Sequence, residues 1–596
     1  MQQLLDYDTF LDKGHDSSGL EDYQKIRCHI IFAVKHDGRH KARFVAGGHL
    51  TEPTNEQVYS GVVSLKAFRL VLFLAELNEL ELYAADVGNA YLEAYTKEKV
   101  YFIAGKEFAD FGMQGHILII KKALYGLSTS GSRWAERFHE VLKSEGFAPS
   151  LADENIWMRK NDEFQIWEYV CVYVDDLAVA MKNPKPFLDK LAAAKEEGGH
   201  NFKLKGVGPL TFHLGCDFAR DPDGTLKYMP KKYIAKMKET YQRLFPGEKI
   251  KEYASALDKG DHPELDASPL LNEEGIAKYQ SMIGALQWLI TLGRFDVATA
   301  TMTMSKFRPA PREGHLNRVK RIYGYVQRFK DAAVRIRTGE PDYQGMSMPE
   351  HDWMYSVYGN VKEEEPAFMP EPLGKRVVTT TFVDANLYHD YLDGRPVTGI
   401  LHFVNQTPVD WYTKKQATVA TATFGSEFVA ARTATDQIMD LHFQLRMLGV
   451  PLKFESHMFG DNKSIITQST LPHSKLTKRH NALAYHRVRE AIASGFLKFI
   501  HLPGAQNPAD VLTKHCGYQE AWPLLKPILF WMGDTAQIQS KGSDKRDTNS
   551  VSLSITPEPV ALNDVAVAVE ASELMTYVAE EPELLSAVGE SFSAVG

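Results

Sequence analysis

Two adjacent aspartates, Asp175 and Asp176, lie between two apolar runs and are the residues best placed to do chemistry. Residues 166–174 before them and 177–181 after them are rich in β-branched and aromatic side chains, which predicts a β-hairpin with both carboxylates at its turn. Two like charges side by side are costly to bury unless cations neutralise them. The pair is therefore either a metal site or a solvated turn. Taken alone, Tyr-x-Asp-Asp favours the solvated turn, because it occurs by chance in roughly one chain in twenty of this length.

A third carboxylate could complete a metal site with these two. Asp86 ends an apolar strand predicted over residues 82–86, and Tyr91 follows five residues later. If the strand lies beside the hairpin, three acids meet at one place. Tyr91 is then either a core aromatic near a strand end or a side chain that contacts a substrate.

A basic strand lies near the N-terminus. Two strand-like runs over residues 30–34 and 42–46 flank the turn signal Asp37-Gly38, and alternation places Lys41 and Arg43 on one face of the second strand. The bland interpretation is a solvated edge strand. The functional one is a pair of cations that hold a triphosphate.

Length and composition predict a folded protein of several domains. The 596 residues predict two to four domains, and the 44% apolar content is enough for real cores. The net charge of −8 is uneven, because residues 541–596 hold ten acidic and three basic side chains. The rest of the chain is close to neutral, so basic patches that bind nucleic acid are not excluded there. We expect residues 541–596 to be a disordered tail.

The cysteines and the N-terminus favour an intracellular protein. No signal peptide begins the chain, and no apolar run approaches the length of a membrane span. We therefore expect a soluble chain with no membrane partner. The four cysteines lack the paired spacing of a zinc knuckle and indicate a reducing compartment: Cys28, Cys171, Cys216 and Cys516.

Six segments in this order and spacing resemble the reverse transcriptase of copia-type (pseudoviral) LTR retrotransposons. The resemblance runs collinearly from about residue 25 to about residue 515, and it favours the metal site over the solvated turn. The segments are Lys41–Ala46, Asp86–Leu92, Leu124–Leu127, Tyr173–Asp176, Phe212–Gly215 and Tyr279–Gly284.

The resemblance implies an α+β right-hand polymerase with fingers, palm and thumb. Two Mg²⁺ ions per active site, or Mn²⁺ in their place, would stabilise the attacking and leaving oxygens of nucleotide transfer. It also implies an RNA template, a DNA primer and dNTPs as partners. Catalytic and metal-binding roles fall on Asp86, Asp175 and Asp176, and nucleotide-binding roles on Lys41, Arg43, Tyr91 and Thr129. Tyr91 would leave no room for a 2′-hydroxyl, and Arg43 would bind phosphate in a bidentate way.

The start of the template-contacting helix departs from the family. Residues 128–134 read Ser-Thr-Ser-Gly-Ser-Arg-Trp, where many relatives read Lys-Gln-x-Pro-Arg-x-Trp. Thr129 stands where a glutamine would approach the nucleotide, and Gly131 where a proline would be. The difference is either the style of one lineage or decay of the site.

Residues 251–345 are helical in pattern and predict a thumb and connection. Lys320, Arg321, Arg328 and Lys330 lie near the apolar stripe of one helix. They are either a solvated face or a grip on the duplex backbone. Residues 346–375 are rich in proline and glutamate and predict a linker.

A second series of acids follows the linker in the order Asp384, Glu427, Asp461 and Asp510, within a predicted βββαβαβα pattern. This series resembles the RNase H domain of the same elements and implies a second site for two Mg²⁺ ions, with all four acids as catalytic and metal-binding residues. RNA–DNA hybrid is the implied substrate. Two features depart from relatives: no histidine stands shortly before the last acid, and Ala482 replaces an acid.

We therefore expect an α+β polymerase followed by an α/β RNase H-like domain and a disordered tail. The function expected is RNA-directed and DNA-directed DNA synthesis with RNase H activity, in a cytoplasmic virus-like particle or the nucleus, with an element-encoded integrase as a further partner. The alternative is a decayed or domesticated copy that binds nucleic acid without catalysis. The expected parts are an N-terminal stump (1–25), fingers and palm (26–250), thumb and connection (251–345), linker (346–375), RNase H-like domain (376–516), C-terminal helical segment (517–540) and acidic tail (541–596).

Overall fold

The computed structural model describes residues 1–531 apart from 35–39, 52–57, 345, 347, 349, 421, 454, 477 and 478. The predicted turn at Asp37-Gly38 and the predicted tail over residues 541–596 lie outside this part of the chain. Among the described residues, no helix combines the length and the apolar character that a membrane crossing needs.

The fingers consist of a two-stranded ribbon and a small sheet. In the ribbon, β3 (Cys28–Val34) pairs with β4 (His40–Ala46), so that Ile31 lies opposite Arg43. The small sheet has the order β1-β7-β6-β2 and a core of phenylalanines. Its first and last strands come from the predicted stump, which is therefore part of the fingers and does not precede them. The strands are β1 (Phe10–Asp12), β2 (Gln24–Lys25), β6 (Val100–Ile103) and β7 (Ile117–Ile120), with α1 (Gln2–Asp6) before them.

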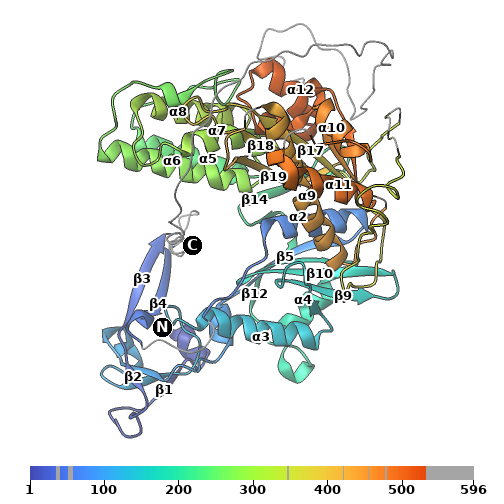
Figure 1. Cartoon of the computed structure of the whole chain (residues 1–596). Helices are drawn as coiled ribbons and strands as arrows, with labels where there is room; N and C mark the ends of the chain where they lie inside the picture. The colour runs from blue at the N-terminus through green and yellow to red at the C-terminus, as the bar shows by residue number, and fades with distance from the viewer. Residues whose placement is uncertain are drawn as a thin grey trace, which may run out of the picture. The chain divides into compact units, whose positions relative to one another are not determined.

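The palm is a six-stranded sheet in the order β12-β5-β11-β10-β9-β8 (Figure 1). Alternate residues of β10 and β11 point to opposite faces, as the two-residue period of a strand requires. Val170 and Val179 face α3 and α4, whereas Cys171 and Ala180 face α2. The bounds are β5 (Glu81–Val87), β8 (Ala148–Pro149), β9 (Ile156–Asn161), β10 (Ile166–Tyr173), β11 (Asp176–Met181), β12 (Leu204–Pro209), α2 (Leu65–Leu77), α3 (Ser130–Ser144) and α4 (Pro184–Ala192).

The thumb and connection combine four helices with a second small sheet of order β13-β14-β15-β16. Within it, the cations predicted to grip a duplex are partly engaged by the protein itself. Lys320 lies 2.7 Å from Glu248 and Arg321 lies 2.7 Å from Asp258, which ties their helix to the preceding loop. The elements are β13 (Phe212–His213), β14 (Cys216–Arg220), β15 (Leu226–Met229), β16 (Val334–Arg335), α5 (Lys231–Leu244), α6 (Glu273–Thr291), α7 (Ala298–Ser305) and α8 (Glu313–Arg328).

The RNase H-like domain is built on a five-stranded sheet in the order β19-β18-β17-β20-β21. The first three strands are antiparallel, and β20 and β21 run parallel to β17, which requires the helical crossovers between them. Helix α10 was not predicted. The elements are β17 (Thr379–Asn386), β18 (Val397–Val404), β19 (Thr407–Lys415), α9 (Thr423–Met447), β20 (Ser456–Gly460), α10 (Lys463–Thr470), α11 (Ala482–Ala493), β21 (Leu497–His501), the 3-10 helix η9 (Pro508–Leu512) and α12 (Tyr518–Leu529).

The predicted linker packs against the RNase H-like domain along much of its length. Trp353 is only 9% exposed and lies 4.8 Å from the guanidinium carbon of Arg489, ring centroid to atom. Tyr358 shares a hydrogen bond of 2.7 Å with the ring of His486, which gives this histidine a structural partner. The predicted linker is therefore held on the surface of this domain by its aromatic side chains, although it is rich in proline and glutamate.

The palm and the RNase H-like domain share one apolar core. Arg69 on α2 stacks over the ring of Trp411 at 4.1 Å and donates to the main-chain oxygen of Val409 at 3.3 Å. Tyr169 on β10 donates its hydroxyl to the main-chain oxygen of Leu448 at 2.8 Å. These buried polar contacts cross from the sheet that carries Asp175 and Asp176 to the domain that carries the second series of acids.

Candidate active sites

The turn between β10 and β11 holds the first pair of acids beside a third. Asp176 begins β11 and lies directly opposite Asp86 in the antiparallel register of β5. Asp175 occupies the turn itself, and its main-chain oxygen accepts from the N–H of Val87 at 2.8 Å. The structure therefore brings together the three acids predicted for polymerase chemistry.

The same turn contains a strained residue. Val174 has a φ of +58°, a left-handed conformation that costs a β-branched residue about 1–2 kcal/mol. Its main-chain oxygen accepts a hydrogen bond of 2.7 Å from the indole Nε1–H of Trp134 on α3. A side chain far away in the sequence thus helps to hold the turn that presents Asp175.

Electrostatics make this site one that attracts cations. Burial and the neighbouring Asp86 raise the pKa of Asp175, and the positive charges of Lys41 and Arg43 pull it back. Burial, Asp175 and Asp86 raise the pKa of Asp176 to about 6. The three carboxylates therefore repel one another when charged, and a bound divalent cation would remove that cost.

The predicted nucleotide-binding residues Arg43 and Tyr91 meet at a tyrosine that the sequence did not single out as a site residue. The guanidinium carbon of Arg43 lies 5.3 Å from the ring centroid of Tyr125, and the rings of Tyr91 and Tyr125 are 4.8 Å apart. Tyr125 belongs to the Leu124–Leu127 motif, so the signal was present, but nothing in that motif shows where the ring points. Lys41 is half-buried on the same strand as Arg43.

Thr129 does not line this site. Its side chain is 1% exposed, and its hydroxyl donates to Oε1 of Glu98 at 2.6 Å, while its own N–H donates to the same oxygen at 3.0 Å. The exposed Ser128 adds a third donor at 3.2 Å. The prediction that Thr129 approaches the nucleotide is therefore wrong in this structure, because the half-buried carboxylate of Glu98 accepts from its hydroxyl. Ser128 and Thr129 instead donate three hydrogen bonds to Oε1 of Glu98.

The second series of acids converges in the RNase H-like domain. Asp384 on β17, Glu427 near the start of α9 and Asp461 just after β20 place one carboxylate oxygen each within 4.8 Å of one another. Asp384 is 1% exposed and Glu427 is also buried. Burial raises the pKa of Glu427 well above its usual range, and Asp384 and Asp461 add to the effect. Oxygen ligands at this spacing suit a hard divalent cation.

The fourth acid, Asp510 on η9, reaches the cluster through a lysine. The ammonium of Lys514 lies 2.7 Å from Oδ1 of Asp510 and 3.3 Å from Oδ2 of Asp384. The hydroxyl of Thr513 donates to the same Oδ2 of Asp384. Burial and Asp384 raise the pKa of Asp510 to about 7 although Lys514 lowers it. Sequence reasoning missed Lys514, because its place four residues after Asp510 has no meaning until η9 is seen beside β17.

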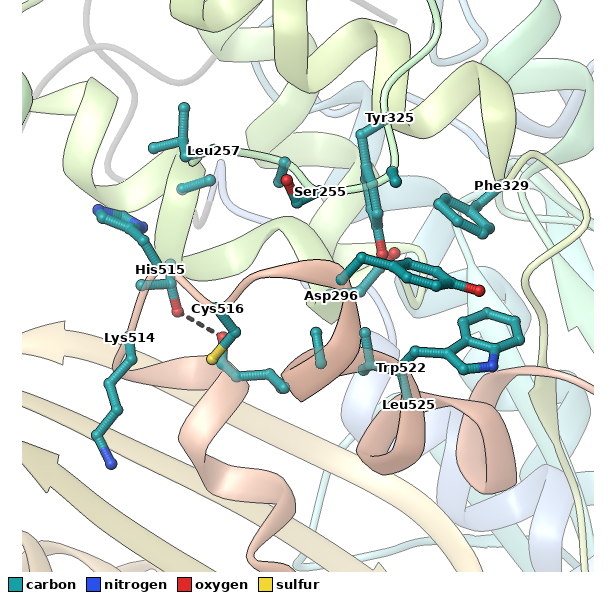
Figure 2. A pocket seen from close by; sticks show the side chains of 17 residues that line it. Ser255, Leu257, Asp296, Tyr325, Phe329, Lys514, His515, Cys516, Trp522 and Leu525 are labelled. Carbon is teal, nitrogen blue, oxygen red and sulfur yellow. Dashed lines mark hydrogen bonds between the residues drawn. The ribbon is translucent and has the colours of Figure 1, made fainter. Parts of the chain in front are cut away.

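The 3-10 helix η9 is anchored on the thumb. A cavity of about 40 Å³ lies beside it, and Figure 2 shows Tyr325, Phe329 and Trp522 grouped on one side with Lys514 extending away from them. Thr299 on α7 donates its hydroxyl to the main-chain oxygen of Val511 at 2.8 Å. A larger groove of about 770 Å³ opens on the other side of Lys514 and Asp510, lined also by Tyr388 and Tyr391.

Residues 20–243 match the family described as reverse transcriptase (RNA-dependent DNA polymerase). This part of the chain is similar to reverse transcriptases. It holds all three acids of the palm as well as Arg43, Tyr91 and Tyr125.

Relatives of the reverse transcriptase domain extend the similarity beyond it. The retrovirus-related Pol polyprotein from transposon TNT 1-94 of Nicotiana tabacum is 26% identical over 505 residues, which cover 82% of this chain and 34% of that protein. The corresponding protein from transposon RE2 of Arabidopsis thaliana is 24% identical over 498 residues, covering 82% and 31%. The chain thus spans about a third of the length of these curated relatives. The predicted resemblance to copia-type retrotransposons is confirmed.

Among solved structures, similarity extends to a foamy viral protease-reverse transcriptase in complex with RNA/DNA hybrid. Identity is 13% with a TM-score of 0.38, over 84% of this chain and 53% of that one. The order of sheets and helices in the described residues confirms the predicted fold class, an α+β unit followed by an α/β unit.

Proposed function

We propose that this chain is an RNA-directed and DNA-directed DNA polymerase that also cleaves the RNA strand of an RNA–DNA hybrid. The observation that carries the proposal is the meeting of Asp86, Asp175 and Asp176 at one turn of a reverse transcriptase domain. A second cluster of buried acids stands in the RNase H-like domain of the same chain. The substrates we propose are an RNA or DNA template, a DNA primer, dNTPs and the hybrid product.

In DNA synthesis, Asp86 and Asp175 would hold divalent cations, with Mg²⁺ favoured by oxygen ligands and Mn²⁺ as a substitute. When bound, the ions stabilise charge on the attacking and leaving oxygens of the phosphoryl transfer. Asp176 adds negative charge beside them. The indole of Trp134 and the N–H of Val87 hold the turn, so that the carboxylates are in position before the substrate arrives.

The incoming nucleotide would be held from the fingers. Lys41 supplies a point charge and Arg43 a planar fork for the triphosphate, and both already influence Asp175. Tyr91 would pack under the sugar and exclude a 2′-hydroxyl, with Tyr125 as its neighbour. Tyr91→Ala should therefore raise incorporation of ribonucleotides relative to deoxyribonucleotides by more than about tenfold, close to 1.4 kcal/mol.

In hybrid cleavage, Asp384, Glu427 and Asp461 would hold a divalent cation that activates water and stabilises charge on the scissile phosphate. Their burial in a shared cluster disfavours three negative charges without such an ion. The domain could distinguish RNA from DNA through the 2′-hydroxyls and the groove shape of the hybrid.

Primer extension tests the polymerase. On poly(rA)/oligo(dT) with Mg²⁺, Asp175→Asn should abolish extension, whereas the matched control Asp189→Asn, an exposed acid on α4, should leave it unchanged. If wild type and Asp175→Asn extend equally, the polymerase assignment fails. No extension by any of the three proteins, together with retained hybrid binding, would indicate a decayed or domesticated copy.

Hybrid cleavage tests the second centre separately. Asp461→Asn should lose cleavage of the RNA strand while primer extension survives. The control is Asp436→Asn, at an acid on the surface of α9 that pairs with Arg487. Loss of both activities in Asp461→Asn would argue against two separate centres.

A further inference from the structure

The four acids of the RNase H-like domain do not form one equivalent set. Asp384, Glu427 and Asp461 share a cluster of oxygens within 4.8 Å, and Asp510 is outside it. Asp510 is linked to Asp384 instead by the ammonium of Lys514, at 2.7 Å and 3.3 Å respectively. One positive charge from the protein therefore already stands between Asp510 and one acid of the cluster, Asp384.

The local chain places this lysine firmly. The N–H of Lys514 donates to the main-chain oxygen of Asp510 at 3.0 Å, and this turn at the end of η9 brings the two side chains to 2.7 Å from each other. The hydroxyl of Thr513 fixes Oδ2 of Asp384, which is the oxygen that Lys514 approaches. The side chain of Lys514 is 37% exposed, so its ammonium is not sealed in place.

Space for an alternative position of the ammonium exists next to the site. Lys514 and Asp510 both line the groove of about 770 Å³, together with Tyr388 and Gly504. In the other direction Lys514 borders the small cavity beside Tyr325, and Figure 2 shows the lysine extending away from that cavity. A displaced ammonium could therefore swing into the groove without unpacking the aromatic side chains.

We propose that, before substrate binds, this site holds one divalent cation between Asp384, Glu427 and Asp461, and that the ammonium of Lys514 takes the place of a second between Asp384 and Asp510. The inference rests on the proposed RNase H function and states how many ions the free protein carries. A second ion must compete with an ammonium held by two carboxylates, so it binds more weakly than the first. The groove receives the lysine when that exchange occurs.

The test is the stoichiometry of Mn²⁺ binding to the full-length protein without nucleic acid, measured by the loss of the free-ion electron paramagnetic resonance signal. Asp86→Asn and Asp175→Asn are introduced throughout to weaken the polymerase site. In this background we expect one ion at the RNase H-like domain, lost in Asp461→Asn. Lys514→Gln should bind a second ion at least about tenfold more tightly than the parent does.

Two further variants make the result specific. Lys514→Arg keeps a cation in the same place and should bind one ion, as the parent does. Lys498→Gln removes a lysine of β21 that pairs with Glu350 and Glu455 and not with the acids of the cluster. This variant should also behave as the parent. If Lys514→Gln proves unstable without metal, its melting temperature should rise more with Mn²⁺ than that of the parent, because two ions then bind only to the folded state.

Two outcomes overturn the inference while leaving RNase H function intact: two ions of similar affinity in the parent, or no second ion in Lys514→Gln. A parent that binds no ion sensitive to Asp461→Asn would instead remove the proposed function, and the inference with it.

Discussion

Trp134 donates its indole N–H to the main-chain oxygen of Val174 at 2.7 Å and so ties α3 to the turn that carries Asp175. The turn needs such support, because Val174 holds a φ of +58° that a β-branched side chain disfavours. Trp134 itself is buried and stacks on Phe138 with ring centroids 5.2 Å apart. The bond therefore couples the position of α3 to the turn that carries Asp175.

Trp134→Phe should separate positioning from packing. The smaller ring keeps most contacts with Phe138 but leaves the oxygen of Val174 without its donor, which costs about 1–2 kcal/mol in the aligned turn. We expect kcat for single-nucleotide addition to fall about 5- to 30-fold, while KM for the dNTP changes little. Steady-state kinetics check this, and Phe138→Leu, which alters packing alone, is the control. An unchanged kcat in Trp134→Phe would show that the turn holds itself.

Thr129→Val tests the corrected role of Thr129. The change removes a hydroxyl that donates to Glu98 at 2.6 Å and leaves a half-buried carboxylate with fewer donors. We expect the free energy of unfolding to fall by about 1–2 kcal/mol and KM for dNTP to stay within about threefold. Chemical denaturation and primer extension measure the two quantities. Ser128→Ala, which removes an exposed donor to the same oxygen, should have the smaller effect on stability. A large rise in KM with unchanged stability would restore the nucleotide-binding role.

The raised pKa of Asp176, about 6, predicts a pH dependence for the metal-free protein. Between about pH 4 and pH 6 the folded protein keeps a proton that the unfolded chain has lost. The stabilising contribution of this group is therefore present in full below about pH 4 and is lost as the pH rises through about 6. In EDTA, Asp176→Asn should be more stable than wild type at pH 8, and the advantage should shrink at pH 4. Urea unfolding at both pH values measures this, and an equal advantage at both would contradict it.

The affinity for Mg²⁺ should rise with pH at both centres, whereas the stabilising contribution of Asp176 in the metal-free protein falls. Protons compete with cations for Asp176, whose pKa is raised to about 6, and for Glu427 and Asp461, whose pKa values burial also raises. Apparent Mg²⁺ affinity should therefore increase as the pH rises from 5 to 8, and calorimetry in two buffers of different ionisation enthalpy should detect released protons. The slope should be shallower in Asp176→Asn. Affinity independent of pH would mean that these carboxyls are already charged.

Arg69→Met should weaken the junction between palm and RNase H-like domain. Arg69 is 6% exposed, stacks over Trp411 at 4.1 Å and donates to the main-chain oxygens of Val409 and Thr291. We expect a loss of about 2–4 kcal/mol in unfolding free energy, since the buried oxygen of Val409 and the partly buried oxygen of Thr291 lose their donor and the stack on Trp411 is lost. The control Arg220→Met breaks an exposed ion pair with Glu76, which lies on α2 as Arg69 does. It should lower the unfolding free energy by less than about 1 kcal/mol. Similar losses in both variants would show that the stack contributes little.

The acids could be found from the sequence because strand-end carboxylates leave a local pattern. Asp86 and the pair Asp175 and Asp176 each follow an apolar run of strand length, and such a run can be recognised from residue type alone. Asp384 and Asp461 have the same kind of signature. The structure places the three palm acids at one turn, and Asp384 and Asp461 in one cluster.

Side-chain direction could not be found in this way. Thr129 matches a nucleotide-contacting position by alignment, but Glu98, which is distant in the sequence, decides where its hydroxyl points. The strands β1 and β2 are two or three residues long and exist only because β7 and β6 accept them as partners. The segment over residues 346–375 was predicted to be a linker because Arg489, the partner of Trp353, lies more than a hundred residues further along the chain.

The sequence by itself determined the order of the two domains, the identity of seven acids and the kinship with copia-type elements, because these depend on residue type and spacing. Only the tertiary structure decided how each acid is used. It set Trp134 against Val174, directed the hydroxyl of Thr129 to Glu98, and placed Lys514 between Asp384 and Asp510. The physical reason is that charge and hydrogen bonding act over a few ångströms of space, and the residues that meet there are far apart along the chain.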